Sequence, residues 1–374
     1  MNRTQRAHLN VEALSHAGMS GKNNEDRYGV ASFVLGTPDK TPVLFAVLAD
    51  GIGGHKAGEV AADLAVNNIL GVVAKSDGRH TRRTIEEAIA NASNAIAARS
   101  ASAEDFKGMG STCATAWIIG DKLHTAYVGD SRIYLIRGGR IQQLTVDHTW
   151  VQEAIEKNII TPEAAREHPN VHVIRRYLGS PVPPEPDFRL KLFNDETDDH
   201  AETNQGMQLL PNDTLLLCSD GLTDLVWNDE ILEMVRSKPA IKDAAKELVE
   251  LANSRGGHDN ITVVLISVPA DFKLKEKKKF DWLPWLLGGV AGSIFVLIVA
   301  SLLTFNLMRR DPTPTLTSTT LPTRQLITST PSGLLKPTST LVPPSPTAVA
   351  KGEEPPPATL TPWPTNTVVV TSTP

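Results

Sequence analysis

The chain has 374 residues, of which 41% are hydrophobic and 21% are charged, and its net charge is −5 at pH 7. This length allows one large domain with appendages, and the composition excludes a chain that is disordered over most of its length. The negative net charge gives no reason to expect nucleic-acid binding. Cys113 and Cys218 both lie in apolar runs, which favours reduced core residues over a disulfide framework.

The first part of the chain predicts three strands followed by two helices. We expect the strands at residues 11–15, 28–34 and 43–49. The last of these is almost entirely apolar, which fits a strand covered on both faces. Apolar residues then recur at helical spacing over residues 58–73 and 84–100, which predicts two helices that each bury one face.

After residue 110 the pattern changes to closely spaced strands, separated by glycine turns that are typical of hairpins. The expected strands and short helices lie at residues 111–119, 123–128, 132–136, 140–144, 150–157 and 161–167. A loop, a further strand and an exposed polar loop are expected at residues 181–186, 188–192 and 194–206. The region then predicts a strand, two helices and a last strand at residues 214–218, 229–236, 240–254 and 261–268. Runs of strands alternating with pairs of helices favour an α+β domain with mainly antiparallel sheets over repeated βαβ units.

The character of the chain changes after residue 270, where the predicted domain of residues 8–270 ends. Residues 271–284 are rich in lysine, and residues 285–308 carry no charge. The uncharged stretch is long enough to span a bilayer as a helix, and it lacks the polar face that a buried amphipathic helix would have.

The lysines predict the orientation of this span. Because most of the basic residues precede it, we expect the domain on the cytoplasmic side of the cell membrane and residues 309–374 outside. This tail is rich in Thr, Pro and Ser, so we expect it to be extended and disordered. An exterior stalk, a glycosylated tail and an inert tether are all compatible with that composition.

Three acidic residues stand at the ends of apolar runs. Asp50 follows residues 43–49, Asp220 follows the run that ends at Cys218, and Asp259 precedes the last strand. A single Asp in a turn is usually a turn residue or a helix cap. If these strands are neighbours, however, three carboxylates meet at one edge of the core, where their repulsion is unfavourable without a cation.

The type of ligand narrows the choice of metal. Oxygen donors without a cluster of Cys or His favour Mg²⁺ or Mn²⁺ over zinc. Two such ions would bridge a water, lower its pKa and direct it at phosphorus. His55 is close to Asp50 in the sequence and is a candidate general acid for the leaving oxygen, although a lone His in a loop is more often an ordinary surface residue.

Six motifs of this chain, in this order, resemble those of the metal-dependent protein phosphatases of the PP2C type. They are Asn24-Glu25-Asp26, residues 49–59 (ADGIGGHKAGE), Gly110-Ser111-Thr112, Gly129-Asp130-Ser131-Arg132, residues 217–222 (LCSDGL) and residues 257–262 (GHDNIT). The resemblance covers roughly residues 8–270, and six ordered motifs are far more specific than one. It implies a four-layer α-β-β-α sandwich of two antiparallel sheets flanked by helices. It also implies hydrolysis of phosphoserine and phosphothreonine in proteins.

The resemblance also assigns roles to residues of this chain. Asp50 would bridge two metal ions, and the carbonyl of Gly51 would ligate one of them. Asp220 and Asp259 would complete the other ion. Glu25 and Asp26, the two acids of the first motif, would act mainly through metal-bound water.

Three further assignments follow from the same motifs. Asp130, together with Asp220, matches a third and weaker metal site of bacterial members. His55 matches the proposed general acid. Residues 149–178 match the flap, a segment beside the active site that varies within the family and influences substrate choice.

One position departs from the family pattern. Family members often read Gly-x-x-Arg-x-x-Asn-Glu-Asp, in which the arginine grips the substrate phosphate, and here Gly21 stands at that position. Lys22 is the candidate replacement, but a lysine offers a point charge where an arginine offers a bidentate contact. We therefore expect weaker substrate binding rather than lost chemistry.

Three functions compete at this point. The first is an active membrane-anchored phosphatase whose partners are phosphorylated proteins, among them Ser/Thr kinases and their substrates. The second is a catalytically weak module that binds phosphoproteins or relays a signal, and the third is a membrane sensor whose tail is the functional part. Asp50, Asp220 and Asp259 favour the enzyme, because binding alone does not need a metal cluster, and Gly21 favours the weak module.

Overall fold

The computed structural model describes residues 1–36, 38–53, 56–273, 296–305 and 308. Two units are distinguished. The first contains the described residues up to 273, and the second contains the helical residues 296–305. The predicted linker, from residue 274 on, and the predicted tail lie outside the described residues, as does most of the predicted membrane span.

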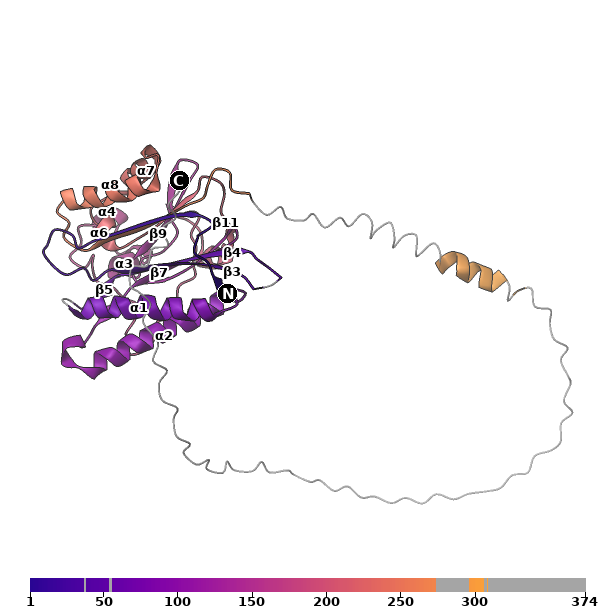
Figure 1. Cartoon of the computed structure of the whole chain (residues 1–374), viewed down its shortest axis with the longest axis horizontal. Helices are drawn as coiled ribbons and strands as arrows, with labels where there is room; N and C mark the ends of the chain where they lie inside the picture. The colour runs from indigo at the N-terminus through magenta and orange to yellow at the C-terminus, as the bar shows by residue number, and fades with distance from the viewer. Residues whose placement is uncertain (37, 54–55, 274–295, 306–307, 309–374) are drawn as a thin grey trace, which may run out of the picture. The chain divides into compact units, whose positions relative to one another are not determined.

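The first unit is built on two antiparallel sheets (Figure 1). The six-stranded sheet has the order β1-β3-β4-β7-β8-β11, with β1 Asn2–Arg3, β3 Arg27–Val34, β4 Pro42–Ala49, β7 Cys113–Ile119, β8 Lys122–Val128 and β11 Met207–Gln208. The five-stranded sheet has the order β10-β9-β12-β13-β2, with β10 Arg140–Gln143, β9 Arg132–Arg137, β12 Thr214–Cys218, β13 Ile261–Ser267 and β2 Asn10–His16. A short pair, β5 Gly51–Ile52 and β6 Gly110–Ser111, stands apart.

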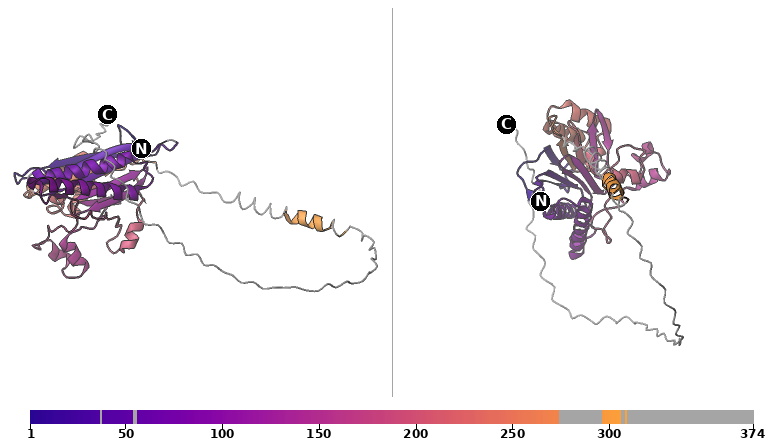
Figure 2. Two further views of the ribbon diagram at one scale, coloured as in Figure 1. Left: turned by 90° about the horizontal axis from the view of Figure 1, so that it is seen from below. Right: turned by 90° about the vertical axis from the view of Figure 1, so that its right-hand side faces the viewer.

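Helices cover the outer face of each sheet, which gives the four layers that the resemblance implies (Figures 1 and 2). The long helices α1 (Lys56–Lys75) and α2 (Thr81–Ser102) pack on the six-stranded sheet. On the five-stranded sheet lie α7 (Asn228–Ser237) and α8 (Ile241–Ser254). The fold class expected for the domain is therefore confirmed.

The sequence of β4 shows how the layers are specified. Phe45 and Val47 point into the core beneath α1 and α2, whereas Leu44 and Leu48 point into the core between the sheets. Because both faces of a strand in this position are buried, a continuous apolar run is required. Trp117 on β7 packs edge-on against Phe45, with ring centroids 5.6 Å apart.

Two expected elements after residue 187 are wrong. Residues 188–192 form no strand, and the expected exposed loop contains the helix α5 (Asp198–Thr203), whose Ala201 is buried. Thr197 caps the N-terminus of this helix, because its side chain accepts a hydrogen bond from the amide of His200. The amide of Leu190 donates a hydrogen bond to the carbonyl of Ala201 at 3.0 Å. The backbone of Leu190 is therefore paired with the helix and not with a neighbouring strand.

The flap connects β10 to the second half of the domain. It carries the short helices α3 (Trp150–Glu156) and α4 (Pro162–Ala165), and it projects from the layered body (Figure 2, magenta). Thr149 accepts a hydrogen bond from the amide of Gln152 and so caps α3. At the base of the flap, Thr149 pairs with Ile174 in an isolated antiparallel bridge.

Among the described residues, one helix is long and apolar enough to cross a membrane, namely Ala57–Lys75. It belongs to α1, and half of it is buried in the domain, as expected of a core helix. Of the predicted span at residues 285–308, the described part is the apolar helix Val296–Phe305 and the single residue Met308. The membrane span therefore stays a prediction.

Candidate metal centre

The sheet registers bring the predicted acids to one edge of the fold. Arg27, directly after Asp26, pairs with Ala49, directly before Asp50. In the other sheet Cys218 pairs with both Val263 and Arg132. Within each sheet the acids therefore lie at the same end of neighbouring strands. The charges of Asp26, Asp130, Asp220 and Asp259 all act on Asp50, so the two groups of acids lie close together. The five acids at this edge are Asp26, Asp50, Asp130, Asp220 and Asp259.

Hydroxyl groups tie Asp50 to the turn that carries Asp130. The amide of Asp50 donates to Thr112 Oγ1 at 3.0 Å, and the amide of Thr112 donates to the Asp50 carbonyl at 2.8 Å. Thr112 Oγ1 also lies 2.7 Å from Ser131 Oγ, which follows Asp130. These hydrogen bonds thus fix the backbone of Asp50.

Asp26 is held from the five-stranded sheet. Ser219 Oγ donates to Asp26 Oδ2 at 2.7 Å. Asn260 Oδ1 accepts from the amide of Glu25 at 2.6 Å, and its Nδ2 donates to the carbonyl oxygens of Ala17 and Asn23. The loop that carries Glu25 and Asp26 is therefore anchored to the residues beside Asp220 and Asp259.

Two glycines allow the backbone to come close to Glu25. A Cβ atom on Gly58, in the first turn of α1, would overlap with Glu25 Oε2, and one on Gly51 would overlap with the carbonyl oxygen of Gly58. Neither glycine has a positive φ, so the requirement at both positions is space. Gly58, in the motif at residues 49–59, thus leaves the space that the Glu25 side chain needs beside Gly51.

The acids raise one another's pKa values. Burial raises the pKa of Asp26 to about 6, and the charge of Asp259 adds to the shift, although hydrogen bonds from Thr262 and Ser219 oppose it. Burial and the charge of Asp147 raise the pKa of Asp130 to about 7, against the opposing charge of Arg132.

The pKa values of Asp50 and Asp220 are shifted furthest in the same direction. Burial raises the pKa of Asp50 well above the usual range, and the negative charges of Asp26, Asp220, Asp130 and Asp259 add to that shift. The pKa of Asp220 is raised in the same way, by burial and then by its acidic neighbours. Several carboxylates at one edge of a core are stable as anions only if a cation compensates them.

Two carboxylate oxygens support a divalent metal as that cation. Asp26 Oδ1 and Asp130 Oδ1 are buried and have no hydrogen-bond partner among the described residues. Buried polar atoms are almost always paired, so these two oxygens fit ligand or water-bridged positions. The donor set consists of oxygens, which suits Mg²⁺ or Mn²⁺. The residues present therefore fit the metals that the resemblance implies.

A cleft of about 370 Å³ opens beside the acids and is bordered by the flap. Arg166 and His172 line it from the flap side, and Asp224 and Asp259 line it from the other side. His172 Nδ1 lies 3.5 Å from Asp224 Oδ2. The guanidinium of Arg166 stacks over the ring of Trp227, with 3.4 Å between its carbon and the ring centroid. The cleft is thus lined both by guanidinium groups, of Arg132 and Arg166, and by carboxylates.

The remaining predicted residues are placed as follows. Glu25 and Gly51 lie beside each other, as described above. His55 lies outside the described residues, so its role as general acid stays a prediction. Lys22 is exposed on the loop that leads to Glu25. Gly21 is also exposed, with φ +75°, and a Cβ atom there would meet nothing within 4 Å.

Two charged residues beside the acids were not predicted from the sequence, namely Asp224 and Asp147. Asp224 raises the pKa values of both Asp220 and Asp130, and Asp147 forms an ion pair of 2.6 Å with Arg132. A local signal for Asp147 existed, because Asp147-His148 directly precedes the N-terminal cap of a predicted helix. Nothing local pointed to Asp224, which follows Asp220 by one helical turn.

The chain matches known proteins over the region just described. The family model described as Protein phosphatase 2C matches residues 15–265. Protein phosphatase PhpP of Streptococcus pneumoniae is 33% identical over 263 residues, which are 70% of this chain and 98% of that protein. Serine/threonine protein phosphatase PstP of Mycobacterium tuberculosis is 34% identical over 285 residues, which are 76% of this chain and 48% of that protein.

Solved structures agree with this match. The serine/threonine phosphatase of S. agalactiae superposes with a TM-score of 0.60 at 32% identity, covering 70% of this chain and 100% of that one. The catalytic domain of PstP in complex with two manganese ions superposes with a TM-score of 0.57 at 33% identity, covering 70% of this chain and 98% of that one. The chain therefore belongs to the PP2C-type family of protein serine/threonine phosphatases, which are hydrolases.

Proposed function

We propose that this protein hydrolyses phosphoserine and phosphothreonine in proteins with the help of Mn²⁺ or Mg²⁺, at the cytoplasmic face of a membrane. The observation that carries the proposal is the meeting of five acids from both sheets, two of which have a buried oxygen without a hydrogen-bond partner among the described residues. The catalytic domain of PstP was solved in complex with two manganese ions, which supports manganese as a metal that such a site can bind.

The residues of the chain divide the work at the site. Asp50 and the carbonyl of Gly51 would hold one ion, and Asp50, Asp220 and Asp259 the other. Asp26 and Glu25 would orient water around them. When bound, two divalent ions lower the pKa of a water and offset the charge of the phosphate.

Asp130, with Asp220, would hold a third and weaker ion. His55 would donate a proton to the serine or threonine oxygen as it leaves. Lys22, which lies just before the Asn24-Glu25-Asp26 motif, would contribute a positive charge to the incoming phosphate.

The place of action follows from the charge pattern around residues 285–308. The lysines before this stretch favour a single span with the phosphatase domain in the cytoplasm and residues 309–374 outside. A domain held in this way would meet phosphorylated proteins at the membrane, including Ser/Thr kinases and their substrates.

One experiment on the full chain tests both parts of the proposal. Inside-out membrane vesicles from cells that express the protein should release phosphate from an added phosphothreonine peptide when Mn²⁺ is present, and right-side-out vesicles should not. Vesicles with the Asp220→Asn variant give the background. No release above that background, even after detergent, would refute the enzyme and favour the binding module, whereas release from right-side-out vesicles would refute the orientation alone.

The glycine at the phosphate-gripping position leads to a separate prediction. Gly21→Arg should lower KM for a phosphopeptide while kcat changes little, because an arginine can form a bidentate phosphate contact that a glycine cannot supply. Since Gly21 has φ +75°, the change also costs about 1 kcal/mol of backbone strain.

Gly108→Arg is the matched control for that strain. Gly108 has the same φ of +75°, is exposed, and likewise has nothing within 4 Å of a built Cβ. Steady-state kinetics and thermal melting should show similar destabilisation in both variants but a lower KM for Gly21→Arg alone. An unchanged KM combined with a changed kcat would contradict the prediction.

A further inference from the structure

The end of the domain opposite the acids is formed by the other ends of the same strands. β3 begins beside Asp26 and runs to this far end, where the amide of Gly120, in the turn between β7 and β8, donates to the carbonyl of Pro42 at the start of β4. In the five-stranded sheet β9 runs away from Asp130, so its hairpin with β10, at residues 138–139, lies at the far end as well. Figure 1 shows β5 and the N-terminus at opposite ends of the layered body.

His8 joins the two sheets at this far end. Its Nε2 lies 2.9 Å from the carbonyl oxygen of Gly120 in the six-stranded sheet, and β2 of the five-stranded sheet begins shortly afterwards, at Asn10. Phe272 packs against the core between the sheets, and its ring centroid lies 6.3 Å from that of His8. The last described residues of the domain, up to Lys273, therefore lie at the far end.

The far end carries more exposed bases than exposed acids. Asp121 and Asp213, which lie there, are buried, and Asp213 forms an ion pair of 2.6 Å with Arg137. The exposed acids of this end are fewer than its bases and include Asp39, Asp77 and Asp271. Exposed bases come from separate segments of the chain. We call them the basic end, and they are Arg6, Lys40, Lys75, Lys122, Arg140 and Lys273.

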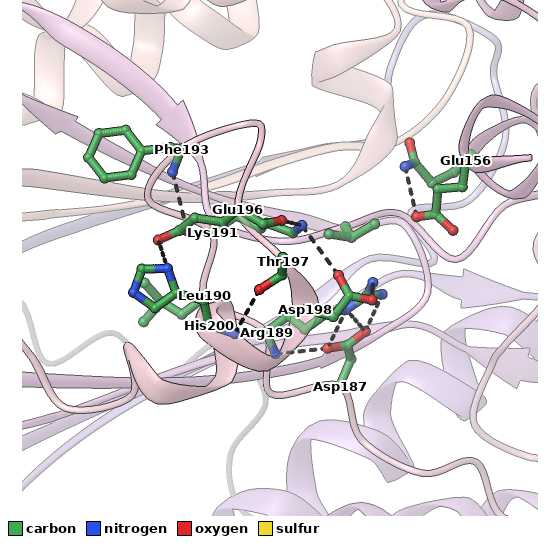
Figure 3. A network of polar contacts seen from close by, with 12 residues as sticks. Glu156, Asp187, Arg189, Leu190, Lys191, Phe193, Glu196, Thr197, Asp198 and His200 are labelled. Atoms are coloured by element: carbon green, nitrogen blue, oxygen red, sulfur yellow. Dashed lines mark hydrogen bonds and ion pairs between the residues drawn. The ribbon is translucent and has the colours of Figure 1, made fainter. Parts of the chain in front are cut away.

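The acids of α5 are paired with other cations. Figure 3 shows Asp198 beside Arg189, at 2.9 Å, and Asp198 also pairs with Lys191 at 3.3 Å. Glu202 pairs with Arg82 at 2.8 Å. Because these cations do not belong to the basic end, the acids of α5 leave its positive charge in place.

We propose that the basic end binds the anionic surface of a bilayer, so that the metal centre faces away from the membrane. The inference rests on the proposed function, because it requires the membrane span at residues 285–308. Opposite charges favour this contact, since a basic residue at an anionic leaflet strengthens binding by about fivefold. The acids at the other end of the domain would be repelled by the same surface.

The sequence after Lys273 supports a lipid surface as the partner. Four further lysines follow before the uncharged stretch begins at residue 285, and they are Lys275, Lys277, Lys278 and Lys279. A chain of this length reaches at most about 40 Å when it is fully extended. The domain would thus stay at high local concentration beside the bilayer, where a weak electrostatic contact is sufficient.

This orientation determines which phosphorylated residues the enzyme reaches. β3 has 8 residues and leads from the far end to Asp26, which corresponds to roughly 25 Å at about 3.3 Å per residue. The metal centre would therefore stand at least that far from the lipid headgroups. Its substrates would carry their phosphate on a domain or segment that extends this far from the membrane, and not directly beside a membrane span.

Two pairs of charge reversals test the contact. Lys122→Glu with Arg140→Glu alters exposed residues of the basic end, whereas Lys107→Glu with Lys157→Glu alters exposed residues near the other end and on the flap. Both pairs change the net charge equally. Because none of these residues belongs to the metal centre, both variants should hydrolyse a soluble phosphothreonine peptide like the wild type, which also shows that they are folded.

The readout is tryptic cleavage after Lys40, which is exposed shortly before β4, in the full chain held in lipid nanodiscs. Discs of phosphatidylglycerol should slow this cleavage about tenfold or more relative to discs of phosphatidylcholine, both for the wild type and for the Lys107 and Lys157 variant. The Lys122 and Arg140 variant should lose most of this protection. About 1 M NaCl should abolish the protection, because charges are then screened within about 3 Å.

Equal cleavage on the two kinds of disc, or equal protection of the two variants, would overturn the proposal. Retention of the chain on the discs in about 1 M NaCl tests the span separately, because salt of this strength removes proteins that are held by charge alone. A chain released by salt would overturn the proposed membrane location and this orientation with it.

A second measurement tests the distance of the metal centre from the bilayer. Phosphothreonine peptides are attached to lipid through linkers of about 3 or about 15 residues, which reach about 10 Å or about 50 Å. On phosphatidylglycerol discs the wild type should hydrolyse the long-linked peptide at least about tenfold faster, and the Lys122 and Arg140 variant should reduce this difference. Equal rates in the wild type would overturn the orientation. If neither these peptides nor the soluble one is hydrolysed, the proposed enzyme is refuted, and the protection of Lys40 still decides the contact with lipid.

Discussion

Asp50→Asn is expected to lower the Mn²⁺-dependent phosphatase activity by more than about a hundredfold. Residues that only support a metal ligand already contribute 10- to 100-fold, and Asp50 lies at the centre of the cluster, where four other acids raise its pKa. Asparagine keeps the size of the side chain but removes the charge that would bridge two cations. The measurement is kcat/KM on a phosphothreonine peptide at saturating Mn²⁺, with the full chain.

Asp224→Asn is the matched control for this prediction. Asp224 belongs to the same acidic region, and its carboxylate lies within 4.8 Å of ligand atoms of His172 and Asp220, but it is exposed and outside the predicted ligand set. Its loss should reduce activity far less than the loss of Asp50. Equal losses in the two variants would mean that the total negative charge of the region matters, rather than a specific bridging position.

The metal-free protein should become less stable as the pH rises, and Asp130→Asn should remove part of that loss. The pKa of Asp130 is raised to about 7 from an ordinary value of 3.8. The folded state therefore holds a proton that the unfolded chain releases between about pH 4 and pH 7. Stability contributed by this group is fully present below the unfolded pKa and is lost as the pH rises through the folded pKa. Each pKa unit corresponds to about 1.4 kcal/mol.

The test compares thermal melting of the wild type and Asp130→Asn in a chelator at several pH values. At pH 8 the metal-free variant should melt roughly 5 °C or more above the wild type, since 1 kcal/mol shifts the melting temperature of a domain of this size by about 2–4 °C. The difference should shrink toward pH 4, and Mn²⁺ should stabilise the wild type more than the variant. A difference that does not grow with pH would contradict the raised pKa.

Much of the fold was predictable because it depends on short-range patterns. The apolar run of β4 predicted burial on both faces, and its residues alternate between the two cores. The meeting of Asp50, Asp220 and Asp259 was predictable on the condition that their strands are neighbours. The structure meets that condition only in part: the strands beside Asp220 and Asp259 are neighbours in one sheet, whereas Asp50 follows a strand of the other sheet, which packs against the first across a shared core.

The parts that could not be predicted depend on contacts between distant residues. The buried ring of His148, for example, forms a hydrogen bond with Asp187, 39 positions away, and no periodicity reveals such a pair. The segment after Asp187 looked like a strand followed by a polar loop. It folds differently because Leu190 pairs with the helix α5, which Thr197 caps. Likewise, the space beside Glu25 that Gly51 and Gly58 provide is visible only once α1 is docked.

The acids of the candidate metal centre come from both sheets of the sandwich, so bound metal would affect how long the folded protein survives in a cell. Asp26 and Asp50 belong to the edge of one sheet, and Asp220 and Asp259 to the edge of the other. A cation held between these acids would link the two layers, and the stability that it adds would grow with the logarithm of the free ion concentration. A shortage of manganese would then expose the protein to cellular proteases, so metal supply would govern the amount of enzyme as well as its rate.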